Sequence, residues 1–191
     1  MSVVTTPISR PVLADAVGGT RARDLGLTVG FALTIALAAQ VSVPLPVGPV
    51  PMTLQTFAIL LGAAALGGVR AVGGASLYVA LGAAGVPWFA VSGGATAGYL
   101  VGFVAAAGLV GWLARHGGDR SVARAAVTMV LGNLVIYLLG VAGLALVTGM
   151  GATEAVAVGV LPFLLGDAAK VVLAATLLPA AWRLLGARRD A

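Results

Sequence analysis

Long stretches without a charged residue alternate with short basic segments along this chain of 191 residues. No charged residue occurs in 25–69, in 71–114 or in 125–153, and a fourth stretch, 155–182, contains only two. One membrane-spanning helix needs about 20 apolar residues. The first two stretches are therefore long enough to cross a bilayer twice, and the last two once each. The pattern predicts six transmembrane helices.

Composition agrees with this interpretation, because 60% of the residues are hydrophobic and 9% are charged, against roughly 25% charged in a soluble domain. The expected fold class is an all-α integral membrane protein. We expect a cytoplasmic N-terminal segment at 1–24, a six-helix transmembrane domain at 25–183 and a cytoplasmic basic tail at 184–191.

The basic residues indicate the orientation of the helices. Ten of the eleven are arginines, and they fall in the N-terminal segment, in the tail and in every second predicted turn: Arg10, Arg21, Arg23, Arg70, Arg115, Arg120, Arg124, Arg183, Arg188 and Arg189. Cytoplasmic loops carry an excess of Lys and Arg, so both termini are predicted to be cytoplasmic. The net charge of +5 thus reflects orientation, and no nucleic-acid partner is expected.

Two ionisable residues interrupt the last apolar stretch. Asp167 and Lys170, the only lysine, are three residues apart and share one face of a helix. Each costs about 2.5–3.5 kcal/mol at the centre of a membrane, so both should point into the bundle. They could neutralise one another between helices, but a buried ion pair adds little net stability. The pair therefore favours a ligand that carries both an amide-like group and an acid.

Further polar side chains lie in or near the apolar spans, mostly toward their outer halves. Each alone could form a hydrogen bond between helices, but as a set they predict a polar cavity. The candidate substrate-binding residues are Asp167, Lys170, Tyr99, Gln55, Thr53, Tyr78 and Asn133, with Tyr137 as a further polar candidate.

Prolines and small residues mark two other features. The segment Pro44–Pro51 contains four prolines and cannot continue a helix, which predicts a stiff, extended external loop. Trp88, in the next outer turn, could anchor the chain at the membrane interface or cover a ligand.

Ala32 and Ala36 are four residues apart on the first helix. This spacing allows close packing, either inside the bundle or against a partner protein.

Motifs of catalysis are missing from the sequence. The single histidine, His116, falls in a basic turn, and no GxxxxGK[ST] phosphate-binding motif occurs. We expect no enzymatic activity, no metal and no cofactor. The alternative to a ligand-binding protein is a small membrane enzyme that uses Asp167 and Lys170 as an acid–base pair. Uptake driven by ATP would require partner subunits.

Four segments, in order along the chain, resemble the signature segments of the BioY family: PVPMTLQTFAILLGAAALGG, YVALGAAGVPWF, GGATAGYLVGF and LPFLLGDAAK. Members of this family are biotin-specific S components of energy-coupling factor transporters. They are six-helix bundles with both termini in the cytoplasm. The resemblance covers residues 27–182.

This resemblance implies a function and a set of contacts. Asp167 and Lys170 would contact biotin, the proline-rich loop would cap the site, and Tyr99 would lie near it. Ala32 and Ala36 would face the transmembrane T component. The implied partners are biotin, the T component, ABC-type ATPases and the lipid bilayer, in the cytoplasmic membrane of a prokaryote. A solitary biotin facilitator without ATPases is the alternative.

Overall fold

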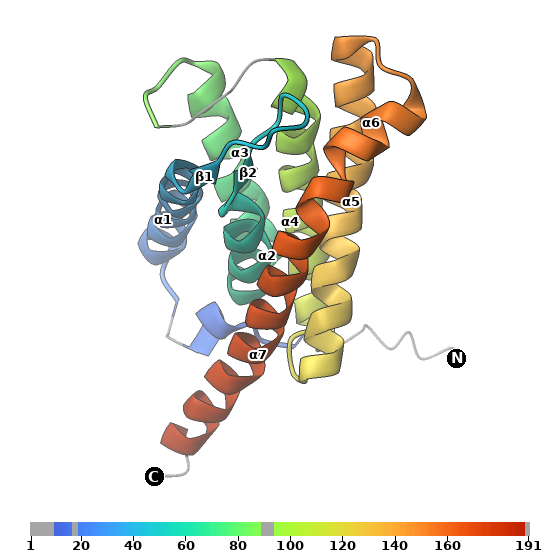
Figure 1. Cartoon of the computed structure of the whole chain (residues 1–191). Coiled ribbons are helices and arrows are strands. Elements are labelled where there is room, and N and C mark those ends of the chain that lie inside the picture. Colours follow the sequence, from blue (N-terminus) through green and yellow to red (C-terminus); the bar gives the residue numbers. More distant parts are fainter. Residues whose placement is uncertain (1–9, 17–18, 89–93, 190–191) are drawn as a thin grey trace, which may run out of the picture.

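The computed structural model describes residues 10–16, 19–88 and 94–189, and these form a bundle of helices (Figure 1). The α-helices are α1 (Arg21–Gln40), α2 (Gln55–Leu66), α3 (Gly68–Ala83), α4 (Ala97–Arg115), α5 (Val122–Thr148), α6 (Ala152–Gly159) and α7 (Leu164–Arg189). Three short 3-10 turns, η1 (Leu13–Ala16), η2 (Gly94–Thr96) and η3 (Leu161–Phe163), and two strands, β1 (Ser42–Val43) and β2 (Met52–Thr53), complete the described elements.

Six apolar helical segments cross the described bundle, as the sequence predicts. Four are long enough to span a membrane, and the last of these, Ala152–Gly186, joins α6, η3 and α7 in series. The other two, α2 and α3, are apolar but shorter, with 12 and 16 residues. Only Gly67 separates α2 from α3, and its φ of 82° is a conformation that glycine adopts readily. Both α1 and α7 extend past the limits of 25 and 183 predicted for the membrane domain.

Glycines allow α4 and α5 to pack with their backbones in contact. A Cβ atom on Gly98 would lie 2.4 Å from the carbonyl oxygen of Leu139, and one on Gly102 would lie 3.0 Å from the Cα atom of Ile136. Small residues at four-residue spacing permit such close approach. The backbone of α5 is thereby fixed beside α4, and both helices contribute to the candidate site.

The basic turns meet at one end of the bundle, where α7 projects beyond the other helices (Figure 1). Residues 10–16, which we call the N-terminal strap, cross this end with Val12 fully buried. Asp15 of the strap forms ion pairs of 2.7 Å with Arg70 and 3.4 Å with Arg115. One carboxylate therefore links the α2–α3 turn to the end of α4. We call this end of the bundle the arginine end.

The proline-rich segment forms a hairpin at the opposite end. Strands β1 and β2 pair antiparallel, with Ser42 opposite Thr53, and no helix forms between them, as predicted. Residues 42–53 are called the hairpin below. It crosses over the bundle toward α6 (Figure 1), and a Cβ atom on Gly48 would lie 3.1 Å from the Val158 side chain.

The expected exposure of Ala32 and Ala36 to a T component is wrong. Their side chains are 1% and 2% exposed, because α1 packs this face against the rest of the bundle. The stripe therefore serves internal packing, the other possibility that the spacing allows. The exposed face of α1 instead carries Gly26, Gly30 and Thr34, again at four-residue spacing.

Candidate functional site

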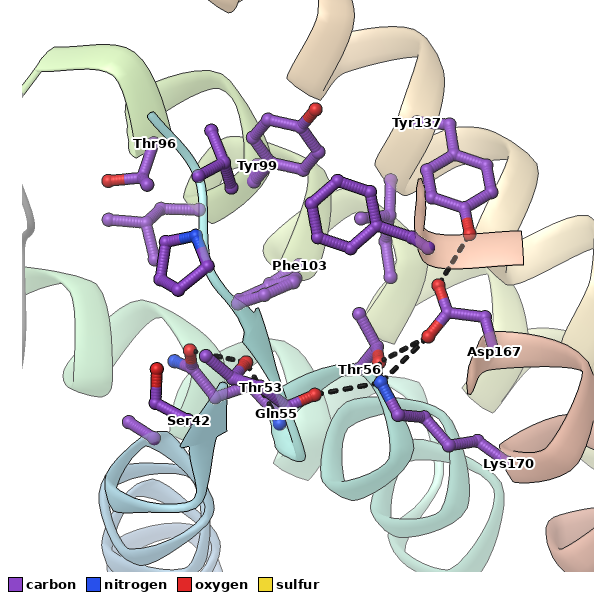
Figure 2. Close-up of a pocket in the computed structure, with 16 residues that line it drawn as sticks. Ser42, Thr53, Gln55, Thr56, Thr96, Tyr99, Phe103, Tyr137, Asp167 and Lys170 are labelled. Carbon is purple, nitrogen blue, oxygen red and sulfur yellow. Dashed lines mark hydrogen bonds and ion pairs between the residues drawn. The ribbon is translucent and has the colours of Figure 1, made fainter. Parts of the chain in front are cut away.

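A cavity of about 190 Å³ lies beneath the hairpin, among α2, α4, α5 and α7 (Figure 2). It is lined by Ala39, Ser42, Val50, Pro51, Thr53, Gln55, Thr56, Thr96, Tyr99, Leu100, Phe103, Ile136, Tyr137, Phe163, Asp167 and Lys170. Five of the seven predicted substrate-binding residues are in this lining. The cavity brings together residues that lie more than 110 positions apart in the sequence.

Asp167 and Lys170 form an ion pair on the wall contributed by α7. The Lys170 Nζ atom lies 2.7 Å from Asp167 Oδ1, and the two side chains are 14% and 4% exposed, respectively. Burial removes most of the screening by water and strengthens this attraction. The pair carries no net charge, and it presents a hydrogen-bond donor next to an acceptor.

Two hydroxyl groups complete the surroundings of the pair (Figure 2). Tyr137 on α5 donates a short hydrogen bond to Asp167 Oδ2. Thr56 on α2 donates to Asp167 Oδ1 over 3.2 Å and accepts from Lys170 Nζ over 2.9 Å. Lys170 also donates to the backbone carbonyl oxygen of Thr53 over 2.7 Å. The ion pair thus connects α2, α5, α7 and the hairpin.

A second polar group lies where β2 meets α2. The Thr53 hydroxyl donates to Gln55 Oε1 over 3.0 Å, and Gln55 Nε2 donates to the Tyr78 hydroxyl oxygen over 2.8 Å. Tyr78 is 1% exposed and lies behind Gln55, outside the cavity lining. This chain of hydrogen bonds orients the Gln55 amide at the cavity wall.

Aromatic side chains form the opposite wall. The Tyr99 hydroxyl donates to the carbonyl oxygen of Gly159 over 2.7 Å, so its ring is held in place. The Phe163 ring lies 6.4 Å from the Tyr99 ring, between centroids, and Phe103 lies nearby in Figure 2. Such rings provide a large apolar surface for a ligand. The cavity combines this apolar wall with one neutral ion pair.

Two other residues considered from the sequence, Asn133 and Trp88, do not line the cavity. Asn133 is 7% exposed and outside the lining, and its Oδ1 atom has no hydrogen-bond partner among the described residues. Trp88 is 66% exposed and also outside the lining, which favours an interface anchor. Among the described residues, no group of acidic, histidine or cysteine side chains could hold a metal ion.

The sequence alone does not distinguish Thr56 as a site residue, although Thr56 contacts both members of the ion pair. Its position directly after Gln55, at the start of an apolar helix, was an available signal. Ser42 and Thr96 were also missed. Single hydroxyl groups of this kind are common in membrane helices and do not by themselves distinguish a cavity from a helix contact.

Comparisons with known proteins agree on one family. A family model described as "BioY family" matches residues 9–187. The "Biotin transporter BioY" of Thermotoga maritima is 40% identical over 152 residues, which cover 76% of this chain and 87% of that protein. The protein of the same name from Rhizobium etli is 34% identical over 170 residues, covering 81% of this chain and 90% of that protein.

A solved structure shares the fold. It is described as the "S-component for biotin from an ECF-type ABC transporter" and superposes with a TM-score of 0.76. The match covers 87% of this chain and 94% of the other, at 17% sequence identity. It supports the arrangement of the helices, which is that of a multi-pass membrane protein.

Proposed function

Because the chain belongs to the BioY family, we propose that it binds biotin and acts as the S component in biotin uptake across the cytoplasmic membrane of a prokaryote. The observation that carries this proposal is the buried cavity, which joins an aromatic wall to the neutral Asp167–Lys170 pair. Relatives named as biotin transporters match over most of their length. Mass spectrometry of the ligand retained after purification from membranes tests the proposal: biotin is expected, and failure of the protein to bind added biotin would refute it.

The ion pair suggests which part of biotin it meets. Biotin carries a cyclic urea, in which a carbonyl oxygen adjoins an N–H group, and a separate carboxylate. We propose that Lys170 donates to the urea oxygen while Asp167 accepts from the urea N–H. A carboxylate at Lys170 would instead add a negative charge beside Asp167 in a buried site, and burial of an uncompensated charge is costly. The opposite assignment, in which Lys170 meets the carboxylate and Asp167 the urea N–H, lacks this charge balance.

The first prediction tests this orientation. In Lys170→Ala, the affinity for biotin and the affinity for its methyl ester should fall by the same factor. The same equality between the two ligands is expected in Asp167→Ala. Truncating one member of a buried charged contact costs about 2–5 kcal/mol, or roughly 30-fold to several thousand-fold in Kd. The measurement is a binding titration on folded, monodisperse protein. Thr176→Ala, which removes an exposed hydroxyl group from the same helix, is the control. A loss for the acid alone in Lys170→Ala would place the lysine at the carboxylate.

We also propose partners for transport, a T component and ABC-type ATPases. The sequence has no phosphate-binding GxxxxGK[ST] motif, so ATP-driven uptake needs another subunit. The exposed face of α1 fits a transmembrane partner, because Gly26, Gly30 and Thr34 lie along an apolar groove between α1 and α2. Small residues in such a groove permit a close approach of another helix. Biotin uptake into cells or vesicles that lack T and ATPase subunits would instead support a solitary facilitator.

A further inference from the structure

Two buried side-chain oxygens among the described residues have no hydrogen-bond partner, Asp119 Oδ1 and Asn133 Oδ1. Asp119 lies in the turn between α4 and α5 at the arginine end, and its Oδ1 atom is 3.4 Å from Arg120 Nε. Asn133 lies within α5 and is 7% exposed. Burying an acceptor without a partner is unfavourable. A donor that reaches the Asn133 oxygen in another arrangement of the side chains would therefore be favoured.

The register of α5 and α7 places Asn133 beside the ion pair. The two helices pack together and run in opposite directions (Figure 1), and Tyr137 on α5 donates to Asp167 on α7. Asn133 precedes Tyr137 by four residues and lies on the same face of α5. Lys170 follows Asp167 by three residues and lies on the same face of α7. Asn133 and Lys170 therefore both lie one turn nearer the arginine end than the hydrogen bond between the other two residues.

Lys170 carries the donor that can move. Its ammonium group has three N–H donors, which are used by Thr53 O at 2.7 Å, Asp167 Oδ1 at 2.7 Å and Thr56 Oγ1 at 2.9 Å. The group stands on a flexible stem of four carbons, so it can change position while α7 stays in place. A buried ammonium needs an acceptor in any position. In the described part of the membrane-spanning helices, Asn133 Oδ1 is the buried side-chain oxygen that is still without a donor.

The carboxylate of Asp167 would remain hydrogen-bonded after such a movement. Tyr137 donates to its Oδ2 atom and Thr56 donates to its Oδ1 atom. These two hydroxyl groups come from α5 and α2 and do not depend on Lys170. The cavity would lose only the donor that we assign to the urea oxygen. Its affinity for biotin would fall, while the helices around it stay packed.

We propose that Asn133 Oδ1 accepts the ammonium group of Lys170 in a second, low-affinity state of the protein, from which biotin dissociates faster. Asn133 is then a positioning residue that acts through Lys170 and does not touch the ligand, in agreement with its place outside the cavity lining. The structure shows the first state, in which Lys170 is directed toward Thr53 and Thr56. This inference rests on the proposed function, with biotin as the ligand.

Dissociation rates of biotin from purified protein test the exchange, because they report how often the low-affinity state is reached. Asn133→Leu replaces the amide by an apolar side chain of similar size and removes the acceptor, so dissociation should slow. Asn133→Asp offers the ammonium group a charged acceptor, which binds it more strongly, so dissociation should accelerate. Couplings within one hydrogen-bond network correspond to changes of roughly 2- to 150-fold. A merely structural role of Asn133 would not give opposite signs for the two variants.

The same substitutions in a Lys170→Met protein are the matched control, since no ammonium group remains to be accepted. The effect of Asn133→Leu on the dissociation rate should disappear there, and so should that of Asn133→Asp. If the buried charge of Asn133→Asp prevents folding, the comparison of Asn133→Leu in the two backgrounds decides the question. An unchanged rate in Asn133→Leu, or an equal change with and without Lys170, would overturn the inference. Absence of biotin binding by the parent protein in a titration would refute the proposed function, and the inference with it.

Discussion

The carboxylate of Asp167 is supported on both oxygens, and one of its donors can be removed with little change to the shape of the cavity. Tyr137→Phe deletes the hydroxyl group that donates to Oδ2 and keeps the ring. A hydrogen bond to a charged group contributes about 1.5–3 kcal/mol. Because this hydroxyl group holds the Asp167 carboxylate in the orientation proposed for its contact with the urea, biotin affinity should fall by roughly 10- to 150-fold without it.

Binding titrations measure this loss, and Tyr78→Phe provides the matched comparison. Tyr78 lies behind Gln55 rather than in the lining, so its hydroxyl group should matter less. Affinity close to that of the parent in Tyr137→Phe would show that the hydroxyl group does not position Asp167 for a ligand.

Among single residues, the sequence is most informative for those whose transfer into the membrane costs the most free energy. Asp167 and Lys170 could be assigned to the bundle interior because lipid exposure of either is too costly, and both line the cavity. Uncharged polar residues were less predictable. Gln55 faces the cavity while Asn133 does not, and Thr56 was missed. Their hydrogen-bonding groups suit a ligand and a neighbouring helix equally well, so only the packing of the helices distinguishes them.

At the scale of one element, α1 has two stripes of small residues with different roles. Gly30 is exposed, and a side chain added there would meet no described atom within 4 Å. Ala36 is 2% exposed. Gly30→Trp should therefore leave biotin binding intact and weaken co-purification with the T component. Ala36→Trp should lower the thermal stability of the protein, since overpacking a core costs typically 1–3 kcal/mol or more.

The measurements are a titration, a pull-down with the T component and a thermal unfolding curve for each variant. Undiminished capture of the T component by Gly30→Trp would move the partner surface away from this groove. Normal stability of Ala36→Trp would contradict the internal packing of the buried stripe.

The elements that were predicted correctly are those with a long apolar pattern. The run 155–182 indicated one span, but in the structure this span is broken between α6 and α7. Pro162 lies in the 3-10 turn η3 at this break, because its ring and its missing N–H prevent continuous helical hydrogen bonding. Strands β1 and β2 were not predicted, since two residues give too short a pattern to recognise.

Across the whole molecule, the N-terminal strap joins segments that the sequence places far apart. Asp15 pairs with Arg70, whose side chain is 15% exposed, and with Arg115. Asp15→Ala should reduce the free energy of unfolding by about 1.5–3 kcal/mol and leave biotin affinity unchanged, because the cavity is at the opposite end. Asp24→Ala, which removes a more exposed partner of the same arginine, should have a smaller effect.

The ion pairs of Asp15 also make the stability of the protein depend on pH. Burial raises the pKa of Asp15, but the hydrogen bond from Arg70 and the nearby positive charges outweigh it, so the pKa lies below its usual value. The stabilisation is then complete above the unfolded pKa of about 3.9 and is lost as the pH falls through the lower folded pKa. Unfolding curves of the parent should lose this contribution at acid pH, and those of Asp15→Ala should not. Parallel pH dependence in both proteins would contradict the role of Asp15.

The shortness of α2 has a consequence for the surrounding lipid. Its 12 residues make a helix about 18 Å long, whereas the hydrocarbon core of a bilayer is about 30 Å thick. Where the groove between α1 and α2 faces lipid, acyl chains must shorten or the protein must tilt, and each ångström of this hydrophobic mismatch costs a fraction of a kcal/mol. A partner helix in the groove would displace those chains, so the membrane itself would favour assembly, and more strongly as its lipids lengthen.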